Sequence, residues 1–203
     1  MINLYQAYFD LKLRKINSMV TESNTQRLID VIDETSSSRS QIILISGLSG
    51  TGKTALMSSL KSQSNNFYFL SLDSFGEQKD GKWILDVEGV EKFLTSHRSQ
   101  TVVMEGVSDN MEAIASIVPI DKLIYLKPEV SLFRDINGAK YKETELSETP
   151  EAWRDHWLKM STITDNRYDK LIQSKIELAS RIKCKSFVTF EVNREGHVVR
   201  GWH

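Results

Sequence analysis

The stretch GLSGTGKT, residues 47–54, decides the fold class of this chain. It fits the pattern G-x-x-x-x-G-K-[ST] at every fixed position, and it comes one residue after the apolar run IILI at 42–45. Glycines allow backbone angles that turn successive N–H groups inward, so such a loop forms a concave nest for an anion at the start of a helix. The pattern therefore predicts a strand, a phosphate-binding loop and a helix, in that order.

Every residue of this loop is a candidate contact for the phosphates of a nucleoside triphosphate. These residues are Gly47, Leu48, Ser49, Gly50, Thr51, Gly52, Lys53 and Thr54. The Lys53 ammonium is expected to bridge the outer phosphates, and the Thr54 hydroxyl is expected to bind Mg²⁺. ATP and Mg²⁺ are thus the expected cofactors. The loop alone does not decide between motor work, a regulatory switch and transfer of phosphate to an acceptor.

From residue 41 onward, short apolar runs alternate with amphipathic stretches. The runs predict strands over 42–45, 67–72, 101–104 and 123–126. The stretches between and after them predict helices over 53–61, 87–96, 110–117 and 129–137. Continuous apolar strands separated by helices are typical of a parallel sheet that is covered on both faces. We therefore expect an α/β fold with a central parallel sheet.

The last third of the chain predicts further helix and a terminal β-hairpin. Residues 141–149 are rich in Lys, Glu, Thr and Ser and are expected to be exposed. The sequence Thr149-Pro150-Glu151 predicts a new helix with proline in its first turn, running with a break near 164–166 to about residue 183. The hairpin is expected over 187–201, with its turn at 193–196.

The chain divides into a short extension and one main domain. Residues 1–40 predict an N-terminal helical extension, with helices over 4–16 and 24–34. Residues 41–203 form the α/β domain, which includes a lid region over about 134–168.

Composition excludes several other classes of protein. The 203 residues have a formal net charge of −1 and 40% hydrophobic content, so broad attraction to nucleic acid is not expected. Cys184 is the only cysteine, which excludes an intrachain disulfide and a thiolate metal cluster. No apolar run approaches the ~20 residues of a membrane helix, and charges interrupt the N-terminal residues, so neither a membrane nor a signal peptide is expected. These features favour a cytoplasmic setting and leave the oligomeric state open.

Two carboxylates are expected at the same sheet edge as the loop. Asp73 follows the second strand in SLDSF, and Glu105 ends the third strand in VVMEG. Ligands of open α/β sheets bind at the carboxyl ends of the strands. Asp73 there can orient and deprotonate an acceptor hydroxyl, or alternatively cap the next turn. Glu105 can hold the water shell of Mg²⁺ or contact the acceptor.

A motor ATPase would more often have an adjacent Asp-Glu pair, whereas Gly106 follows here and leaves space for the chain to turn away.

Together, GLSGTGKT, LSLDSF and VVMEG resemble the P-loop small-molecule kinases of the uridine kinase, nicotinamide riboside kinase and gluconate kinase group, over about residues 41–135. The resemblance implies the three-layer α/β fold of P-loop NTPases and transfer of the γ-phosphoryl group of ATP to an alcohol group. It also implies that Asp73 is the base, that Lys53 and Thr54 bind phosphate and metal, and that Glu105 lies near metal or substrate.

Kinases of this group usually carry several arginines in a lid over the transferring phosphate, and here the sequence departs from the group. Arg134 follows the LIYL strand by one helix, so it is the first candidate for neutralising the transition-state charge. The alternative for Arg134 is a solvated ion pair with Asp135 or Glu129. The stretch that follows offers Lys140 and Lys142 instead of arginine.

The acceptor side carries weaker signals. Phe75, two residues after the expected base, and Trp83, in the connection after the second strand, are candidate substrate contacts. Trp153 and Trp157, four residues apart, are expected to pack in the core. The favoured partner is a small hydroxyl acceptor, nucleoside-like by resemblance. Three alternatives remain: a hydroxyl on a modified base or end of a nucleic acid, a regulatory or motor ATPase, and a nucleotide-binding scaffold that transfers no phosphate.

Overall fold

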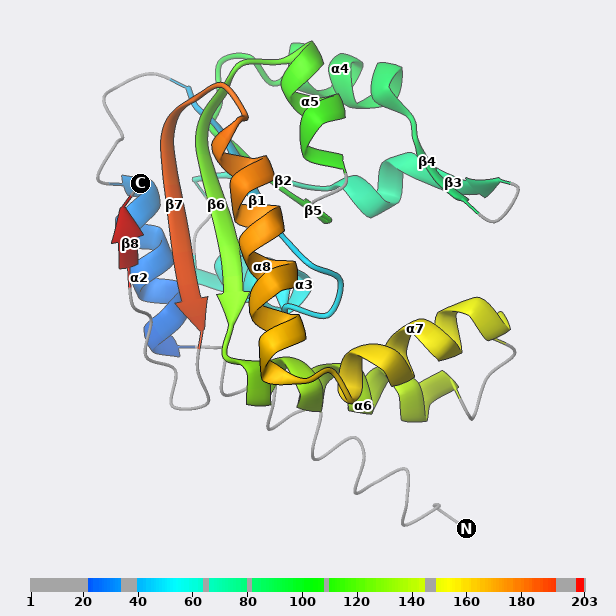
Figure 1. Cartoon of the computed structure of the whole chain (residues 1–203). Coiled ribbons are helices and arrows are strands. Elements are labelled where there is room, and N and C mark those ends of the chain that lie inside the picture. Colours follow the sequence, from blue (N-terminus) through cyan, green and yellow to red (C-terminus); the bar gives the residue numbers. More distant parts are fainter. Residues whose placement is uncertain are drawn as a thin grey trace, which may run out of the picture.

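The chain forms a mostly parallel central sheet with helices on both faces (Figure 1). The structure is a computed structural model and describes residues 22–33, 40–63, 66–79, 82–107, 110–144, 149–192 and 200–202. The strand order is β2-β5-β1-β6-β7-β8. The parallel strands are β1 (Ile42–Gly47), β2 (Tyr68–Ser71), β5 (Val102–Val107), β6 (Ile120–Pro128) and β7 (Cys184–Val192). The predicted three-layer α/β fold is thereby confirmed.

The predicted terminal hairpin strands are also present. β8 (Arg200–Trp202) pairs antiparallel with β7 at the edge of the sheet. β7 begins at Cys184, earlier than predicted, because its whole length pairs with β6. The hairpin turn predicted near 193–196 and the predicted helix 4–16 lie outside the described residues.

Helices cover the two faces of the sheet in two groups. The helices are α2 (Glu22–Asp33), α3 (Lys53–Gln63), α4 (Val87–Ser96), α5 (Met111–Ile117), α6 (Val130–Thr144), α7 (Glu151–Ser161) and α8 (Asp165–Ser180). On β1, Leu44 packs in one core with α4, α5 and α8, whereas its neighbours Ile43 and Ile45 pack in the other with α2 and α3. Because successive strand side chains point to opposite faces, a strand covered on both faces needs an unbroken apolar run.

The first described helix belongs to the main core. Leu28, Val31 and Ile32 of α2 are buried in the same cluster as β1 and α3. The buried Lys122 of β6 donates a hydrogen bond from Nζ to the carbonyl of Val31, near the C-terminal end of α2. A cation is favourable at that end because the last carbonyls of a helix carry partial negative charge. The charged Asp121 and Lys122 also explain why β6, which starts at Ile120, is longer than the apolar run that predicted it.

Two helix boundaries differ from the prediction. α6 continues to Thr144, so the first four residues of the segment predicted to be exposed are helical. Lys142 and Glu143 are exposed as predicted, whereas Thr144 is not. The Thr144 side chain is buried and donates a hydrogen bond to the Tyr141 carbonyl, 2.6 Å away. In α7, Pro150 is the N-cap residue, one position before the predicted place in the first turn.

A small second sheet follows β2 and was not predicted. β3 (Gly76–Lys79) and β4 (Lys82–Leu85) form an antiparallel hairpin that extends from the main body (Figure 1). Between β2 and this hairpin, residues Leu72–Phe75 form the short 3-10 helix η1. No helix in the described part of the chain is long and apolar enough to span a membrane.

Candidate functional site

The loop after β1 has the backbone of a phosphate-binding nest. Gly50 and Gly52 have φ angles of 80° and 84°, in the left-handed region that glycine adopts without strain. Gly47 is needed for close approach instead, since a Cβ there would lie 3.0 Å from the carbonyl oxygen of Leu126 on β6. The loop ends at the first residue of α3, so the helix N-terminus faces the nest.

Lys53 is held inside the loop. Its side chain is buried, and Nζ donates hydrogen bonds to the carbonyl oxygens of Gly47 and Leu48, at 3.2 and 2.8 Å. Burial lowers the pKa of the Lys53 amine to about 8; Glu105 and Asp73 oppose that shift, and Lys140 adds to it. The ammonium is therefore electrostatically coupled to three charged side chains from other parts of the chain.

A cavity of about 270 Å³ opens beside the loop. It is lined by Ser49, Gly50, Thr51, Gly52, Lys53, Thr54, Ala55, Asp73, Glu105, Val107, Ile136, Ala139, Lys140 and Glu143. These residues come from the loop and α3, from η1, from β5 and from α6. The structure thus brings together the two predicted carboxylates and the phosphate loop, as the parallel sheet requires at the carboxyl ends of its strands.

Asp73 is exposed on η1, at the turn that leaves the sheet after β2. Leu72 is fully buried and anchors this turn. Phe75, the last residue of η1, packs its ring at 6.0 Å from the Phe93 ring of α4, edge to face. Phe75 is not among the described residues that line the cavity, and its ring contact with α4 helps to fix the turn. A substrate contact at Phe75 stays a prediction.

The predicted substrate contact at Trp83 lies in β4. Its backbone pairs with Gln78 across the hairpin, and its side chain lies outside what the structure describes. A substrate role for Trp83 stays a prediction.

Glu105 is a buried carboxylate with one clear partner. Only 2% of the residue is exposed, and Ser71 Oγ donates a hydrogen bond to its Oε1 over 2.6 Å. The contact follows from strand pairing, because Ser71 and Glu105 are opposite each other in the β2–β5 register. Ser71 was missed from the sequence, since only the strand order places β2 beside β5.

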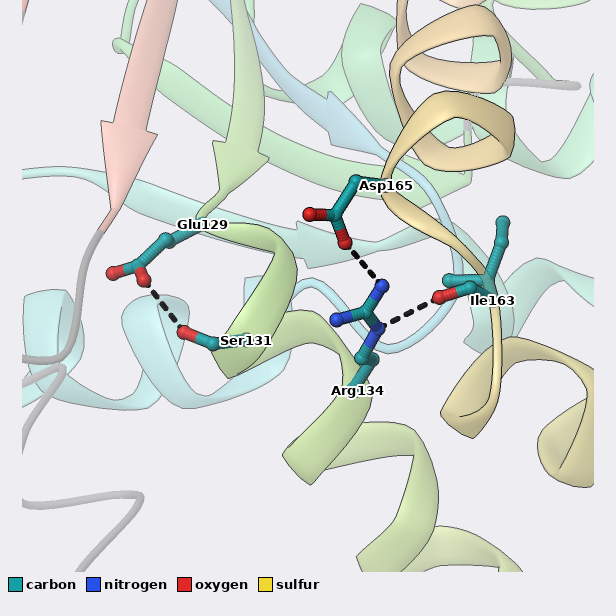
Figure 2. A network of polar contacts seen from close by, with 5 residues as sticks. All are labelled: Glu129, Ser131, Arg134, Ile163 and Asp165. Carbon is teal, nitrogen blue, oxygen red and sulfur yellow. Dashed lines mark hydrogen bonds and ion pairs between the residues drawn. The ribbon is translucent and has the colours of Figure 1, made fainter.

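Arg134 is not among the residues that line the cavity, and its guanidinium points toward Ile163 and Asp165 (Figure 2). Its Nε donates a hydrogen bond to the carbonyl of Ile163 at 2.7 Å, and its guanidinium forms an ion pair with Asp165 at the start of α8. Glu129, one of the two predicted partners, accepts a hydrogen bond from Ser131 at 2.6 Å. In this arrangement Arg134 ties α6 to α8, and its predicted role at the phosphate is not supported.

Helical geometry explains why Lys140 lies at the cavity and Arg134 does not. The cavity-facing residues of α6 are Ile136, Ala139, Lys140 and Glu143, spaced i, i+3, i+4 and i+7 on one face. Arg134 is two positions before Ile136, about 200° around a helix of 3.6 residues per turn. The spacing shows in the sequence that these four residues share one helix face. Which face of α6 meets the loop depends on how the helix packs in the tertiary structure.

No protein-family model and no curated protein sequence matches the chain. Among solved structures, a possible uridine kinase from Bacillus stearothermophilus is 18% identical, with a TM-score of 0.41 over 61% of this chain and 91% of that chain. The YGR205w protein is 10% identical, with a TM-score of 0.48 over 87% of this chain and 94% of that chain. Shikimate kinase from Bacteroides thetaiotaomicron is 18% identical, with a TM-score of 0.33 over 69% of this chain and 96% of that chain. The likeness is one of fold.

The donor set at the cavity fits Mg²⁺ and a triphosphate. The Thr54 hydroxyl and the Glu105 carboxylate both line it, and oxygen ligands are those that Mg²⁺ takes. Among the described residues no cluster of three His, Cys, Asp or Glu side chains could hold a metal by itself. Mg²⁺ at this place would therefore depend on phosphate oxygens and water for its other ligands, as is usual for nucleotide-bound magnesium.

Gly106 has a different role from the predicted one. β5 continues through it to Val107, so the chain does not turn away there. A Cβ at Gly106 would lie 2.6 Å from Leu72 Cδ1 and 3.2 Å from Leu72 Cβ. Its missing side chain lets Leu72 pack onto β5, which sets the position of the neighbouring Asp73.

Gly106→Ala is expected to lower the free energy of unfolding by about 1–3 kcal/mol, because the added methyl overpacks the contact with Leu72. Urea unfolding of wild type and of Gly106→Ala measures this difference in stability. Gly138→Ala, inside α6, is the matched control. A Cβ there would meet only Ser161 Cβ, at an ordinary contact distance of 3.6 Å. That variant is expected to be more stable by roughly 0.5–1 kcal/mol. Equal stability of Gly106→Ala and wild type would contradict the packing role.

Proposed function

We propose that this protein is a kinase that transfers the γ-phosphoryl group of ATP, with Mg²⁺, to a hydroxyl group of a small acceptor. The observation that carries the proposal is the cavity beside the phosphate loop, where Lys53, Thr54, Asp73 and Glu105 meet. A loop alone would serve any nucleotide-binding protein. Transfer to a hydroxyl also needs a group that accepts the hydroxyl proton, and the exposed Asp73 carboxylate in the same cavity is such a group.

In the proposed reaction the acceptor oxygen attacks the γ-phosphorus while its proton passes to the Asp73 carboxylate. The bond from the γ-phosphorus to the bridging oxygen breaks, and ADP leaves with that electron pair. Lys53 binds the outer phosphates, and Thr54 and Glu105 hold Mg²⁺, directly or through water. The metal, when bound, neutralises charge on the phosphates.

Nucleoside-like acceptors are proposed first, because the motifs around Asp73 and Glu105 resemble those of nucleoside kinases. The proposed setting is the cytoplasm, which suits a chain whose one cysteine, Cys184, is free.

An acceptor screen tests the proposed function. The protein is incubated with Mg²⁺ and γ-labelled ATP, alone and with nucleosides, sugars and other small alcohols, RNA and DNA in separate arms. Label transfer to a small alcohol supports the proposal, and transfer to RNA or DNA replaces its acceptor class. Steady hydrolysis without any acceptor identifies an ATPase. Tight ATP binding by calorimetry with no transfer in any arm identifies a nucleotide-binding scaffold.

The affinity for ATP is expected to depend on pH through Lys53. The amine has a pKa of about 8 in the free protein, and bound phosphate raises that pKa by stabilising the charged form. Below the free pKa the amine is charged in both states, so the Kd is constant. Above it, binding must take up a proton, and the Kd is expected to rise up to about tenfold per pH unit.

Calorimetry from pH 6.5 to 9.5 measures both the Kd and the proton uptake. Lys53→Arg is the control, because a guanidinium stays charged throughout this range. Its affinity is expected to be independent of pH. An unchanged pH dependence in Lys53→Arg would assign the proton to another group.

A further inference from the structure

The cavity contains a second lysine that the predicted mechanism does not use. Lys140 lines it from α6, together with Lys53 of the loop and the carboxylates Asp73 and Glu105. Burial lowers the pKa of the Lys140 amine below its usual value, while Glu143, Asp73 and Glu105 act in the opposite direction. The Lys140 side chain is thus partly buried, in the charged surroundings of the site.

A tryptophan holds this lysine. Lys140 Nζ lies 4.4 Å from the centre of the Trp157 ring of α7, well within the roughly 6 Å of a cation–π contact. Trp157 is 7% exposed, which confirms the predicted packing for this residue, whereas Trp153 is 38% exposed. The Trp157 ring is itself contacted by the rings of Trp153 and His156, at 6.0 and 4.8 Å. A long, flexible ammonium side chain is in this way given one preferred position.

The helix that carries Lys140 is also packed against the phosphate loop. Asn137, fully buried and one turn before Lys140, fills the space beside Gly50: a Cβ on Gly50 would lie 2.8 Å from Asn137 Oδ1. Asn137 Nδ2 donates a hydrogen bond to the Phe133 carbonyl at 2.7 Å, which fixes the amide. The position of Lys140 relative to the phosphates is therefore set by direct contact between α6 and the loop.

We infer that Lys140 is the catalytic cation that neutralises charge on the phosphoryl group in transit, and that Trp157 is a positioning residue that holds Lys140 over the site. This inference rests on the proposed kinase function. It gives to a lysine–tryptophan pair the role that the sequence suggested for Arg134, whose guanidinium is engaged by Ile163 and Asp165. A lysine is a point charge without the fixed fork of a guanidinium, so its position must come from a neighbour.

Steady-state kinetics with the full chain tests the inference through a double-mutant cycle. Lys140→Met is expected to lower kcat about a hundredfold, the usual effect of losing one electrostatic contact to the transition state. Trp157→Leu is expected to lower kcat about tenfold, with the KM for ATP within about twofold, as for a buried cation–π contact. Trp157→Phe keeps an aromatic face and is expected to retain most of kcat.

The decisive comparison is Trp157→Leu in the Lys140→Met background. If Trp157 acts through Lys140, the second substitution lowers kcat by less than about twofold there. The same tenfold loss in both backgrounds would overturn the positioning role. Lys142→Met changes an exposed lysine of α6; it is the matched control and is expected to leave kcat unchanged.

A second measurement does not need activity. Lysine amines are reductively methylated with ¹³C, and their NMR resonances are recorded for wild type, Lys140→Arg, Trp157→Leu and Lys142→Met. One resonance is expected to be shifted upfield by the Trp157 ring current. This resonance is expected to be absent in Lys140→Arg, to return to the ordinary position in Trp157→Leu and to be unchanged in Lys142→Met. If Trp157→Leu does not fold, wild type and Lys140→Arg still decide. The absence of a Lys140-dependent shifted resonance overturns the contact.

The two measurements separate failure of the inference from failure of the proposed function. Phosphate transfer by wild type together with full activity of Lys140→Met would overturn the inference and leave the kinase function standing. No transfer to any acceptor, with the shifted resonance present, would overturn the kinase function and with it the catalytic role of Lys140. The lysine–tryptophan contact alone would then stand.

Discussion

Asp73→Asn is expected to lower kcat for phosphate transfer by about a hundredfold to ten-thousandfold, the range that a general base contributes. Asparagine keeps the shape of the side chain but cannot accept the proton of the attacking hydroxyl. Asp73 is exposed at the cavity and only weakly involved in packing, so the fold is expected to be unaffected. The KM for ATP is expected to change by less than about threefold, because the phosphates are bound by the loop.

Initial rates with a saturating acceptor measure this effect, and the melting temperature checks the fold. Asp169→Asn, an equally exposed aspartate on α8, is the matched control and is expected to transfer phosphate at the wild-type rate. A wild-type kcat in Asp73→Asn would show that the acceptor proton leaves by another route.

Lys53→Met is expected to lower kcat by about a hundredfold to a thousandfold and also to weaken ATP binding. The reason is that Lys53 is the cation of the loop, whose Nζ is held by the carbonyls of Gly47 and Leu48. Methionine has nearly the same length and needs no partner for a buried charge, so stability is expected to be equal or higher. Loss of activity in a protein that remains folded would then be electrostatic in origin.

Calorimetry measures the ATP affinity, and a thermal melt without nucleotide measures stability. Lys61→Met is the matched control, because Lys61 is exposed in the last turn of the same helix, α3. It is expected to bind ATP with wild-type affinity. An unchanged kcat in Lys53→Met would remove the loop lysine from the proposed mechanism.

The elements that were predicted well are those whose signals are local. β1, the loop and α3 follow from one motif, since the glycines and the strand before them carry the local signal for this backbone. α4 was predicted at its observed bounds, and Asp86 explains why it begins there: its side chain accepts a hydrogen bond from the Gly89 N–H at 2.9 Å.

The elements that were missed or predicted too short depend on contacts between distant segments. The β3–β4 hairpin has little apolar alternation, with residues such as Glu77 and Lys79 in β3, and each of its strands is defined by pairing with the other. β6 contains Asp121 and Lys122, two charged residues that lie directly before the apolar run 123–126. Both are tolerated because they have partners far along the chain: Asp121 binds the Ile42 N–H at 2.7 Å, and Lys122 binds α2.

The same division holds for the site. The sequence by itself determined a phosphate loop after a central strand, and carboxylates at Asp73 and Glu105 on the same edge, because parallel strands bring their carboxyl ends together. Only the tertiary structure decided that Lys140, not Arg134, faces that edge. Both are cations on one helix, and the angle at which α6 docks, fixed by packing of Asn137 against the loop, selects which of them reaches the cavity.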